Sequence, residues 1–240
     1  MRTFLINLDR NPDRLVSAKR QLDAFGIAFE RFPGIDGRAL SKDELKRHYN
    51  RFRSILVNGK PMALGEIGCA LSHTMLYRKM VEENIPFALI FEDDVKLTDR
   101  FPEMLAAAVK FLDVTRKQVV LFTRHGLSEA ECAAERGVVP IRGGLCAEAY
   151  LITLPAAREI VRVNYPIVII NDKWRRFQRH FGVELYRTLP ATADQDKRTF
   201  GVSDVLQTHP TYRGLMWVMW KLARCIEVPL DRLIIAVTGR

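Results

Sequence analysis

Residues 87–95 read Phe87-Ala88-Leu89-Ile90-Phe91-Glu92-Asp93-Asp94-Val95: five apolar residues, three carboxylates and a valine. The apolar run predicts a buried strand, and the carboxylates fall where that strand ends. Close burial of three like charges raises their pKa values, a penalty that a bound divalent cation removes. Carboxylate oxygens suit hard ions such as Mg²⁺ or Mn²⁺. The segment therefore predicts a metal-assisted phosphate site beyond a strand end, where α/β proteins place ligands. A strand followed by a solvated acidic turn is the alternative.

Strand and helix patterns alternate on both sides of this segment. Residues 3–8 predict a strand, an amphipathic helix closed by Gly26 follows, and residues 27–32 predict a second strand. Further helices are expected over residues 64–83, 101–112 and 156–163, and further strands over residues 118–122 and 147–154. This alternation predicts an α/β fold in which a mostly parallel sheet is flanked by helices.

The composition is that of an ordinary globular protein: 240 residues, 48% hydrophobic and 27% charged. The length allows one substantial core, or a compact domain with an appended tail. No segment reaches the roughly 18 uninterrupted apolar residues of a membrane-spanning helix. Asn7, Asp9 and Arg10 interrupt the first apolar run, so we expect no signal peptide and a cytoplasmic protein.

The cysteines predict neither disulfides nor a metal site. The four of them, Cys69, Cys132, Cys146 and Cys225, are far apart and lack paired metal-ligand spacing. Cys69 and Cys146 lie among small or apolar residues, so we expect them to be buried thiols. Nothing in this arrangement calls for an oxidising compartment.

The net charge of +9 suggests an anionic partner. Much of it comes from a cluster formed by Lys173, Arg175, Arg176, Arg179 and Arg187. The sequence contains no recognisable nucleic-acid-binding module, and aromatic residues are not interleaved with this cluster, so we expect no nucleic-acid partner. An anionic acceptor or membrane surface is favoured, and a solvated basic face is the alternative.

The C-terminal segment differs in character from the rest of the chain. Helical spacing over residues 213–226 groups Arg213, Trp217, Trp220, Lys221 and Arg224 on one arc, opposite an apolar arc. Tryptophan beside basic residues over an apolar face is typical of a helix that lies on an anionic membrane surface. A helix packed on the protein's own core would show the same apolar arc. We therefore expect a main domain over residues 1–204 and a basic, amphipathic helical extension over residues 205–240.

Three segments together resemble glycosyltransferase family 25. They are Ile6-Asn7-Leu8-Asp9-Arg10, Gly65-Glu66-Ile67-Gly68-Cys69-Ala70-Leu71-Ser72-His73 and Glu92-Asp93-Asp94-Val95. The resemblance is clear over residues 1–100, persists through Ala149-Tyr150-Leu151-Ile152 and fades near residue 205. The family includes bacterial lipopolysaccharide and lipooligosaccharide galactosyltransferases and the collagen galactosyltransferases. It implies a GT-A-like, Rossmann-type domain and a metal-assisted, inverting transfer from a UDP-sugar.

The resemblance also implies roles for individual residues. Glu92 and Asp94 would bind the metal, Mn²⁺ or Mg²⁺, in a pair similar to the Asp-x-Asp motif of GT-A enzymes but with glutamate first. The residues expected to bind the donor are Asn7, Asp9, Arg14, Asp36, Gly37, Glu66, Ser72, His73 and Asp93. His73 would donate to the anionic leaving group; a buried, hydrogen-bonded histidine is the alternative. Surface capping is the alternative for Asp9.

An inverting transfer needs a base near the acceptor hydroxyl. Asp172 is the candidate, because it emerges with Asn171 from the apolar residues 167–170. This segment loosely resembles the family's proline–apolar–aspartate segment. A helix N-cap before Lys173 explains Asn171 and Asp172 equally well.

These observations predict a metal-dependent inverting glycosyltransferase. It would transfer a hexose, implied by the family to be galactose from UDP-galactose, to a lipid-linked saccharide of lipopolysaccharide or lipooligosaccharide. We expect it in the cytoplasm, bound peripherally to the cytoplasmic face of the bacterial inner membrane. The rival readings are a non-catalytic binding protein and a metal-dependent phosphohydrolase. The phosphohydrolase would require an aspartate where Glu92 stands.

Overall fold

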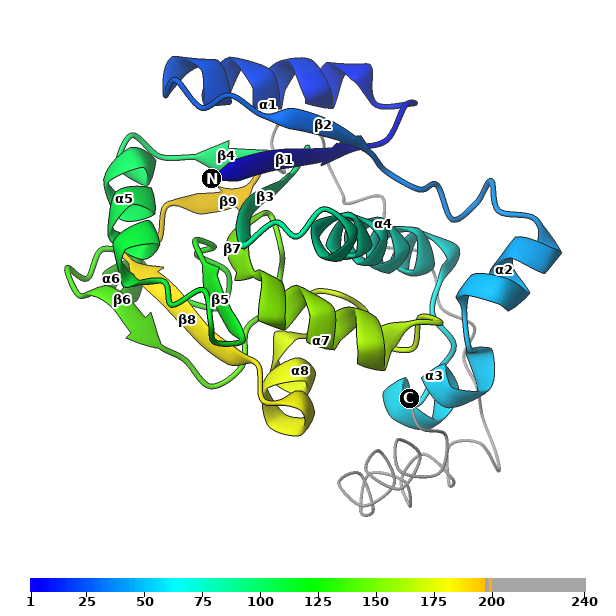
Figure 1. Ribbon diagram of the computed structural model, residues 1–240. Helices are drawn as coiled ribbons and strands as arrows, with labels where there is room; N and C mark the ends of the chain where they lie inside the picture. Colours follow the sequence, from blue (N-terminus) through cyan, green and yellow to red (C-terminus); the bar gives the residue numbers. More distant parts are fainter. Residues whose placement is uncertain (197–198, 200–240) are drawn as a thin grey trace.

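The computed structural model describes residues 1–196 and Thr199. Within this part, seven strands form one sheet in the order β2-β1-β3-β7-β5-β8-β6 (Figure 1). They are β1 (Arg2–Asn7), β2 (Glu30–Pro33), β3 (Phe87–Glu92), β5 (Gln118–Leu121), β6 (Gly137–Pro140), β7 (Ala149–Thr153) and β8 (Glu184–Leu189). β1 pairs in parallel with β2 and β3, and β5 pairs in parallel with β8. β7 runs antiparallel to β3 and β5, and β6 runs antiparallel to β8. Most strands of this sheet therefore point in one direction. Among its described strands, only β7 and β6 run the opposite way.

Helices flank this sheet on both faces (Figure 1). They are α1 (Pro12–Ala24), α2 (Lys42–His48), α3 (Arg51–Asn58), α4 (Leu64–Glu82), α5 (Phe101–Phe111), α6 (Glu129–Cys132), α7 (Leu154–Asn164) and α8 (Trp174–Phe181). A separate two-stranded ladder pairs β4 (Val95–Leu97) with β9 (Ala193–Gln195). The expected α/β fold with a mostly parallel sheet between helices is confirmed.

The alternation of side chains along β3 explains why both of its faces are apolar. Ala88 and Ile90 pack into a core with α4, α7 and α8. Leu89 and Phe91 pack into a second core with α1 and α5. Because successive side chains of a strand point to opposite faces, Glu92 continues the set that faces α4.

The loop after β2 crosses the start of α4 in direct backbone contact. A Cβ atom on Gly68 would lie 2.5 Å from the Gly37 nitrogen and 2.5 Å from the Ile35 carbonyl oxygen. A Cβ atom on Gly37 would lie 1.9 Å from the Leu64 carbonyl oxygen. The Ile35 N–H donates to the Ser72 hydroxyl, with 2.7 Å between the two atoms. The crossing fixes this loop beside the helix and leaves no room for a side chain at Gly37.

Most expected elements occur with small shifts of their ends. The strand expected over residues 27–32 begins only at Glu30, because the Ile27 N–H still bonds the Leu22 carbonyl oxygen at the end of α1 (2.9 Å). The structure adds α2, α3, α6, β4, β6, β8 and β9, for which the sequence analysis predicts no element.

Two expectations about side-chain exposure are wrong. Cys69, which lies within α4, and Cys146 are partly exposed and not buried. Arg187 is only 6% exposed on β8, where it donates to the His125 carbonyl oxygen (3.1 Å). Arg187 is therefore not part of a solvated basic face.

No helix within the described residues is both long and apolar enough to cross a membrane. The expected extension over residues 205–240, with its membrane-facing helix, lies outside the described residues. The domain boundary after residue 204 stays a prediction for the same reason.

Candidate active site

An open cleft of about 610 Å³ lies where the carboxyl ends of β1, β2 and β3 meet. Because these strands are parallel, the polar residues that follow them gather at one edge of the sheet. The lining residues are Ile6, Leu8, Arg10, Arg14, Gly34, Ile35, Asp36, Gly37, Gly65, Cys69, Ser72, His73, Glu92, Asp93 and Asp94. The cleft thus brings together most of the residues that the sequence analysis proposed. Asn7, Asp9, Glu66 and Asp172 do not line it.

Asp93 is held on the α1 side of the cleft. The Asn7 amide donates to Asp93 Oδ2 (2.7 Å), and Arg14 Nη1 lies 3.5 Å from Asp93 Oδ1. Arg14 also lies 4.0 Å from Asp94 Oδ2. Asn7 itself is 2% exposed, and Arg31 donates to its side-chain oxygen (3.0 Å). Asn7 therefore supports the acidic turn, residues 92–94, from beneath the cleft.

The two surface aspartates expected at the site each pair with an arginine. Asp9 forms an ion pair with Arg31, and its side chain is otherwise exposed. Asp36 forms an ion pair with Arg10 at the cleft. Asp36 and Arg10 therefore face the cleft together, whereas Asp9 lies outside it.

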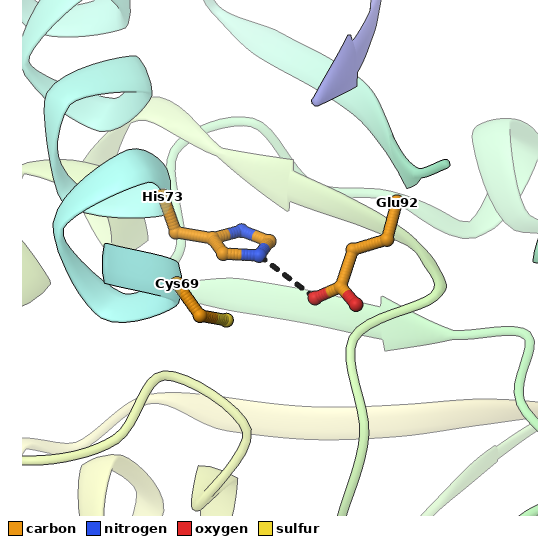
Figure 2. Close-up of side chains that lie close together, drawn as sticks. All are labelled: Cys69, His73 and Glu92. Carbon is orange, nitrogen blue, oxygen red and sulfur yellow. Dashed lines mark hydrogen bonds and ion pairs between the residues drawn. The ribbon is translucent and has the colours of Figure 1, made fainter. Parts of the chain in front are cut away.

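His73 is buried between α4 and the sheet. Its Nε2 lies 2.9 Å from Glu92 Oε1, and its Nδ1 lies 2.7 Å from the Tyr150 hydroxyl (Figure 2). Burial lowers the pKa of His73 to about 3, so the ring is neutral near pH 7. A neutral ring with both nitrogens engaged matches the alternative of a buried, hydrogen-bonded histidine. His73 orients Glu92 at the cleft wall.

Two carboxyl groups of the acidic turn, those of Glu92 and Asp94, have raised pKa values. Burial, followed by the charges of Asp172 and Asp93, raises the pKa of Glu92 to about 8. Burial, followed by the charge of Glu92, raises the pKa of Asp94 to about 7. The backbone of the turn is fixed, because the Asp196 N–H donates to the Asp94 carbonyl oxygen (2.7 Å) beside the β4–β9 ladder.

Glu148 is a further acidic residue at this site, which the sequence analysis misses. The Glu92 N–H donates to the Glu148 carbonyl oxygen (3.0 Å), which places the two residues opposite each other on β3 and the start of β7. Glu148 is 1% exposed, and neither of its carboxylate oxygens has a hydrogen-bond partner. Burial and the charge of Glu92 raise the pKa of Glu148 to about 8. A charged residue at the edge of an otherwise apolar strand pattern, residues 147–154, is the signal that could have found it.

Two sets of side chains could hold a metal ion. Asp94 Oδ1 is buried without a partner, as are both oxygens of Glu148. Glu92 and Asp94 lie near enough to Glu148 for their charges to raise its pKa, and a hard divalent cation would relieve this repulsion between oxygen ligands. Cys69, His73 and Glu92 form a second set, in which the three ligand atoms lie within 4.8 Å of one another (Figure 2).

Asp172 lies close enough to this acidic cluster to raise the pKa of Glu92. Its own pKa is raised by burial, against the opposing effect of Lys173. Its Oδ1 atom is buried without a hydrogen-bond partner. The helix N-cap alternative is wrong, because the N-cap of α8 is Lys173 and no side chain caps this helix.

Glu66 lies at the first turn of α4. Its Oε2 accepts a hydrogen bond from the Ala63 N–H (2.7 Å), which caps the helix. Its charge also raises the pKa of Asp172. Glu66 therefore acts on the site through the helix and through Asp172.

Known proteins are similar in sequence to much of this chain. A sequence model described as "Glycosyltransferase family 25 (LPS biosynthesis protein)" matches residues 1–174. This chain belongs to glycosyltransferase family 25. The matched residues of this family 25 chain include the cleft, the acidic turn, Glu148 and Asp172.

Curated relatives from animals share part of this family 25 chain. A "Glycosyltransferase 25 family member" of Aedes aegypti is 32% identical over 171 residues, which is 66% of this chain and 27% of the relative. "Procollagen galactosyltransferase 2" of Homo sapiens is 26% identical over 173 residues, which is 67% of this chain and 27% of the relative. The matches thus span about a quarter of the length of these relatives. Among solved structures, the galactosyltransferase LgtC, in complex with donor and acceptor sugar analogues, gives a TM-score of 0.42 at 13% identity, covering 78% of this chain and 73% of that one.

Proposed function

We propose that this family 25 chain is an inverting glycosyltransferase that transfers galactose from UDP-galactose to a saccharide of lipopolysaccharide or lipooligosaccharide. The observation that carries the proposal is the group of buried carboxyls at the end of β3 beside an open cleft, in which Asp94 Oδ1 and both Glu148 oxygens have no hydrogen-bond partner. Family membership supports sugar transfer, and the galactosyltransferase name of the human relative supports galactose. The family's description as an LPS biosynthesis protein supports the acceptor.

The donor diphosphate fits the arginine side of the cleft. Arg10 and Arg14 both line it, and guanidinium groups bind phosphate oxygens through paired N–H donors. Asp93 and Asp36 hold these two side chains in place. The Gly34–Gly37 loop lies against α4 and also lines the cleft, and we expect the nucleoside to pack there.

Glu92, Asp94 and Glu148 would hold Mn²⁺ or Mg²⁺, because they supply several buried oxygens and little hydrogen bonding of their own. When bound, such an ion would neutralise the charge that develops on the leaving diphosphate. His73 keeps Glu92 turned toward the cleft through its 2.9 Å hydrogen bond.

Asp172 is the proposed base. As the bond between the acceptor oxygen and the anomeric carbon forms, the acceptor hydroxyl loses its proton to the Asp172 carboxylate, and UDP leaves from the opposite face of the sugar. The raised pKa of Asp172 suits this task, because a base works best when its pKa approaches the working pH. The C-terminal segment would hold the enzyme at the cytoplasmic face of the inner membrane, next to a lipid-linked acceptor.

One assay separates this function from its rivals. The full chain, with Mn²⁺, is offered UDP- and GDP-sugars together with either a lipooligosaccharide saccharide or a procollagen peptide. We expect UDP release from UDP-galactose that depends on the saccharide, with galactose recovered on it. Transfer to the peptide would mean that the acceptor is a procollagen and not a saccharide. Release of inorganic phosphate would indicate a phosphohydrolase, and binding without turnover would indicate a non-catalytic protein.

A further inference from the structure

Three different kinds of metal ligand converge at the inner wall of the cleft. Cys69 and His73 lie one turn apart on the same face of α4, and Glu92 reaches them from the end of β3 (Figure 2). The thiol sulfur, an imidazole nitrogen and a carboxylate oxygen all lie within 4.8 Å of one another. A sulfur and a nitrogen ligand distinguish this set from the all-oxygen set of Asp94 and Glu148.

The surroundings of His73 are those of a metal-binding histidine. Such a residue uses one ring nitrogen for the metal, while an oxygen holds the other. Here Nδ1 lies 2.7 Å from the Tyr150 hydroxyl, and that hydroxyl lies 2.6 Å from the Tyr77 hydroxyl. Both tyrosines are fully buried, so the ring cannot turn freely and Nε2 stays aimed at Glu92 and Cys69.

The site is also open on one side. Cys69, His73 and Glu92 all line the cleft, and Cys69 is partly exposed. Three protein ligands with one position open to solvent form a common arrangement for Zn²⁺, which binds sulfur, nitrogen and oxygen in a tetrahedron. Thiolate and imidazole ligands favour Zn²⁺ over the hard ions Mg²⁺ and Mn²⁺.

We propose that Cys69, His73 and Glu92 form a zinc-binding site in the wall of the cleft, separate from the oxygen site of Asp94 and Glu148. On binding, the Cys69 thiol and the Glu92 carboxyl release their protons to solvent, and three coordinate bonds form from sulfur, Nε2 and a Glu92 oxygen. The hydrogen bond between His73 and Glu92 is lost, and the ring proton resides on Nδ1, where it is donated to Tyr150. Zinc thus occupies a Glu92 oxygen that the ion held by Asp94 and Glu148 would otherwise use.

Cobalt provides a direct test, because Co²⁺ replaces Zn²⁺ in such sites and absorbs light. The full chain, stripped with a chelator, is titrated with Co²⁺. We expect one equivalent to produce a thiolate-to-cobalt charge-transfer band that added Zn²⁺ abolishes. Cys69→Ser should lose the band, and Cys132→Ser, whose thiol is buried at α6, should keep it. A wild-type chain without the band, or a Cys69→Ser chain that retains it, would overturn the site.

Two further measurements do not depend on the folding of Cys69→Ser. Zinc should protect Cys69 of the unmodified chain from alkylation, as read by mass spectrometry, and equal alkylation with and without zinc would overturn the proposal. Tyr150→Phe removes the oxygen that holds Nδ1, so it should weaken zinc binding about tenfold or more. Unchanged zinc affinity in Tyr150→Phe would contradict the role given to His73.

The consequence for catalysis rests on the proposed function. If Glu92 helps to hold the catalytic ion, zinc should inhibit galactose transfer. The zinc concentration that halves the rate should be at least about tenfold higher for Cys69→Ser than for Cys132→Ser. Loss of a zinc ligand weakens binding at least as much as loss of a group that hydrogen-bonds a ligand. If no sugar is transferred under any condition, the proposed function fails, while the cobalt band still decides whether the zinc site exists.

Discussion

Asp94 is buried with one carboxylate oxygen that has no hydrogen-bond partner, and its neighbours Glu92 and Asp93 are also acidic. An unpartnered buried carboxylate is strongly destabilising unless it is protonated or meets a cation. Its raised pKa reflects this situation. The same property makes Asp94 the residue whose replacement should separate metal binding from folding.

Asp94→Asn is expected to abolish turnover and to weaken Mn²⁺ binding while the fold stays intact, because the amide keeps the shape but loses the charge. Turnover, Mn²⁺ affinity by calorimetry and circular dichroism measure the three effects. Asp194→Asn on β9 is the matched control, since that carboxylate is exposed and pairs with Arg124 (3.7 Å) outside the cleft. Full activity of Asp94→Asn in chelator-treated buffer would refute the metal site.

Asp172→Asn tests the base. Loss of a general base is expected to lower kcat by roughly 10²-fold or more. UDP-sugar affinity should stay near that of the wild type, because Asp172 does not line the cleft wall that receives the donor. Calorimetry with UDP-galactose and steady-state kinetics separate the two quantities. Normal donor binding with unchanged kcat would make Asp172 a structural residue.

The same substitution should change how stability depends on pH. Burial raises the folded-state pKa of Asp172 above its unfolded value, so the folded protein binds this proton more tightly. The carboxyl therefore lowers the free energy of unfolding as pH rises above the unfolded pKa, and has no such effect below it. Asp172→Asn removes the ionised form, so its Tm should exceed that of the wild type at pH 8 by more than at pH 4. A constant difference across this range, measured by calorimetric melting, would mean that the pKa of Asp172 is the same in the folded and the unfolded protein.

At the scale of elements, the loop that follows β2 crosses α4 at Gly68. This contact holds the two walls of the cleft together. Replacing glycine by alanine inside a helix normally stabilises it by up to about 1 kcal/mol. Here the new Cβ atom would lie 2.5 Å from two backbone atoms, which cannot move like the tip of a side chain. Overpacking of this kind destabilises by about 1–3 kcal/mol, so the clash should win.

Gly68→Ala should therefore lower the free energy of unfolding, measured in urea. Gly144→Ala is the control, because its Cβ would meet the end of the Leu121 side chain (2.7 Å), which can shift. The loss should be clearly larger for Gly68→Ala than for Gly144→Ala. Donor affinity should fall in Gly68→Ala as well, since the loop forms a wall of the cleft. Equal losses in the two variants would remove the special role of the crossing.

The sequence predicts those elements whose apolar pattern is long and regular. The β3 run from Phe87 to Phe91 and the helix α4 are examples, since burial on one or both faces shapes their composition. Strand β8 escapes prediction because Arg187, on a polar-looking segment, is buried between β5 and the edge strand β6. The short elements α6 and β9 are set by tertiary contacts, which no local pattern encodes.

Some residues of the candidate site can likewise be predicted from the sequence, and others cannot. Glu92, Asp93 and Asp94 are found from the strand that delivers them, since carboxyl ends of parallel strands converge. Glu148 is missed because its partner across the sheet, Glu92, is 56 positions earlier, and only antiparallel pairing of β7 with β3 brings them together. Cys69 is misjudged as buried, because its apolar sequence neighbours do not reveal that the helix borders a cleft.

At the scale of the whole molecule, the cleft residues and the basic C-terminal pattern lie in different parts of the sequence. The cleft lies within residues 6–94, whereas the basic tryptophan-bearing pattern occupies residues 213–226, outside the described residues. An enzyme that modifies a lipid-linked saccharide must act close to a membrane while drawing its nucleotide sugar from solution. A weak, reversible membrane contact through residues that do not line the cleft would serve both needs.

We therefore predict salt-sensitive binding to anionic membranes through residues 213–226. Arg213, Lys221 and Arg224 should each contribute about 1 kcal/mol near an anionic surface, and salt should screen this attraction. Co-sedimentation compares anionic with neutral vesicles for the full chain, for a full chain in which these three residues are replaced by glutamate, and for a chain ending at Thr211. The full chain should sediment with anionic vesicles at low salt and be released at high salt, and both altered chains should remain in solution. Equal binding by all three, or no preference for anionic lipid, would mean that the pattern reflects ordinary packing on the protein's own core.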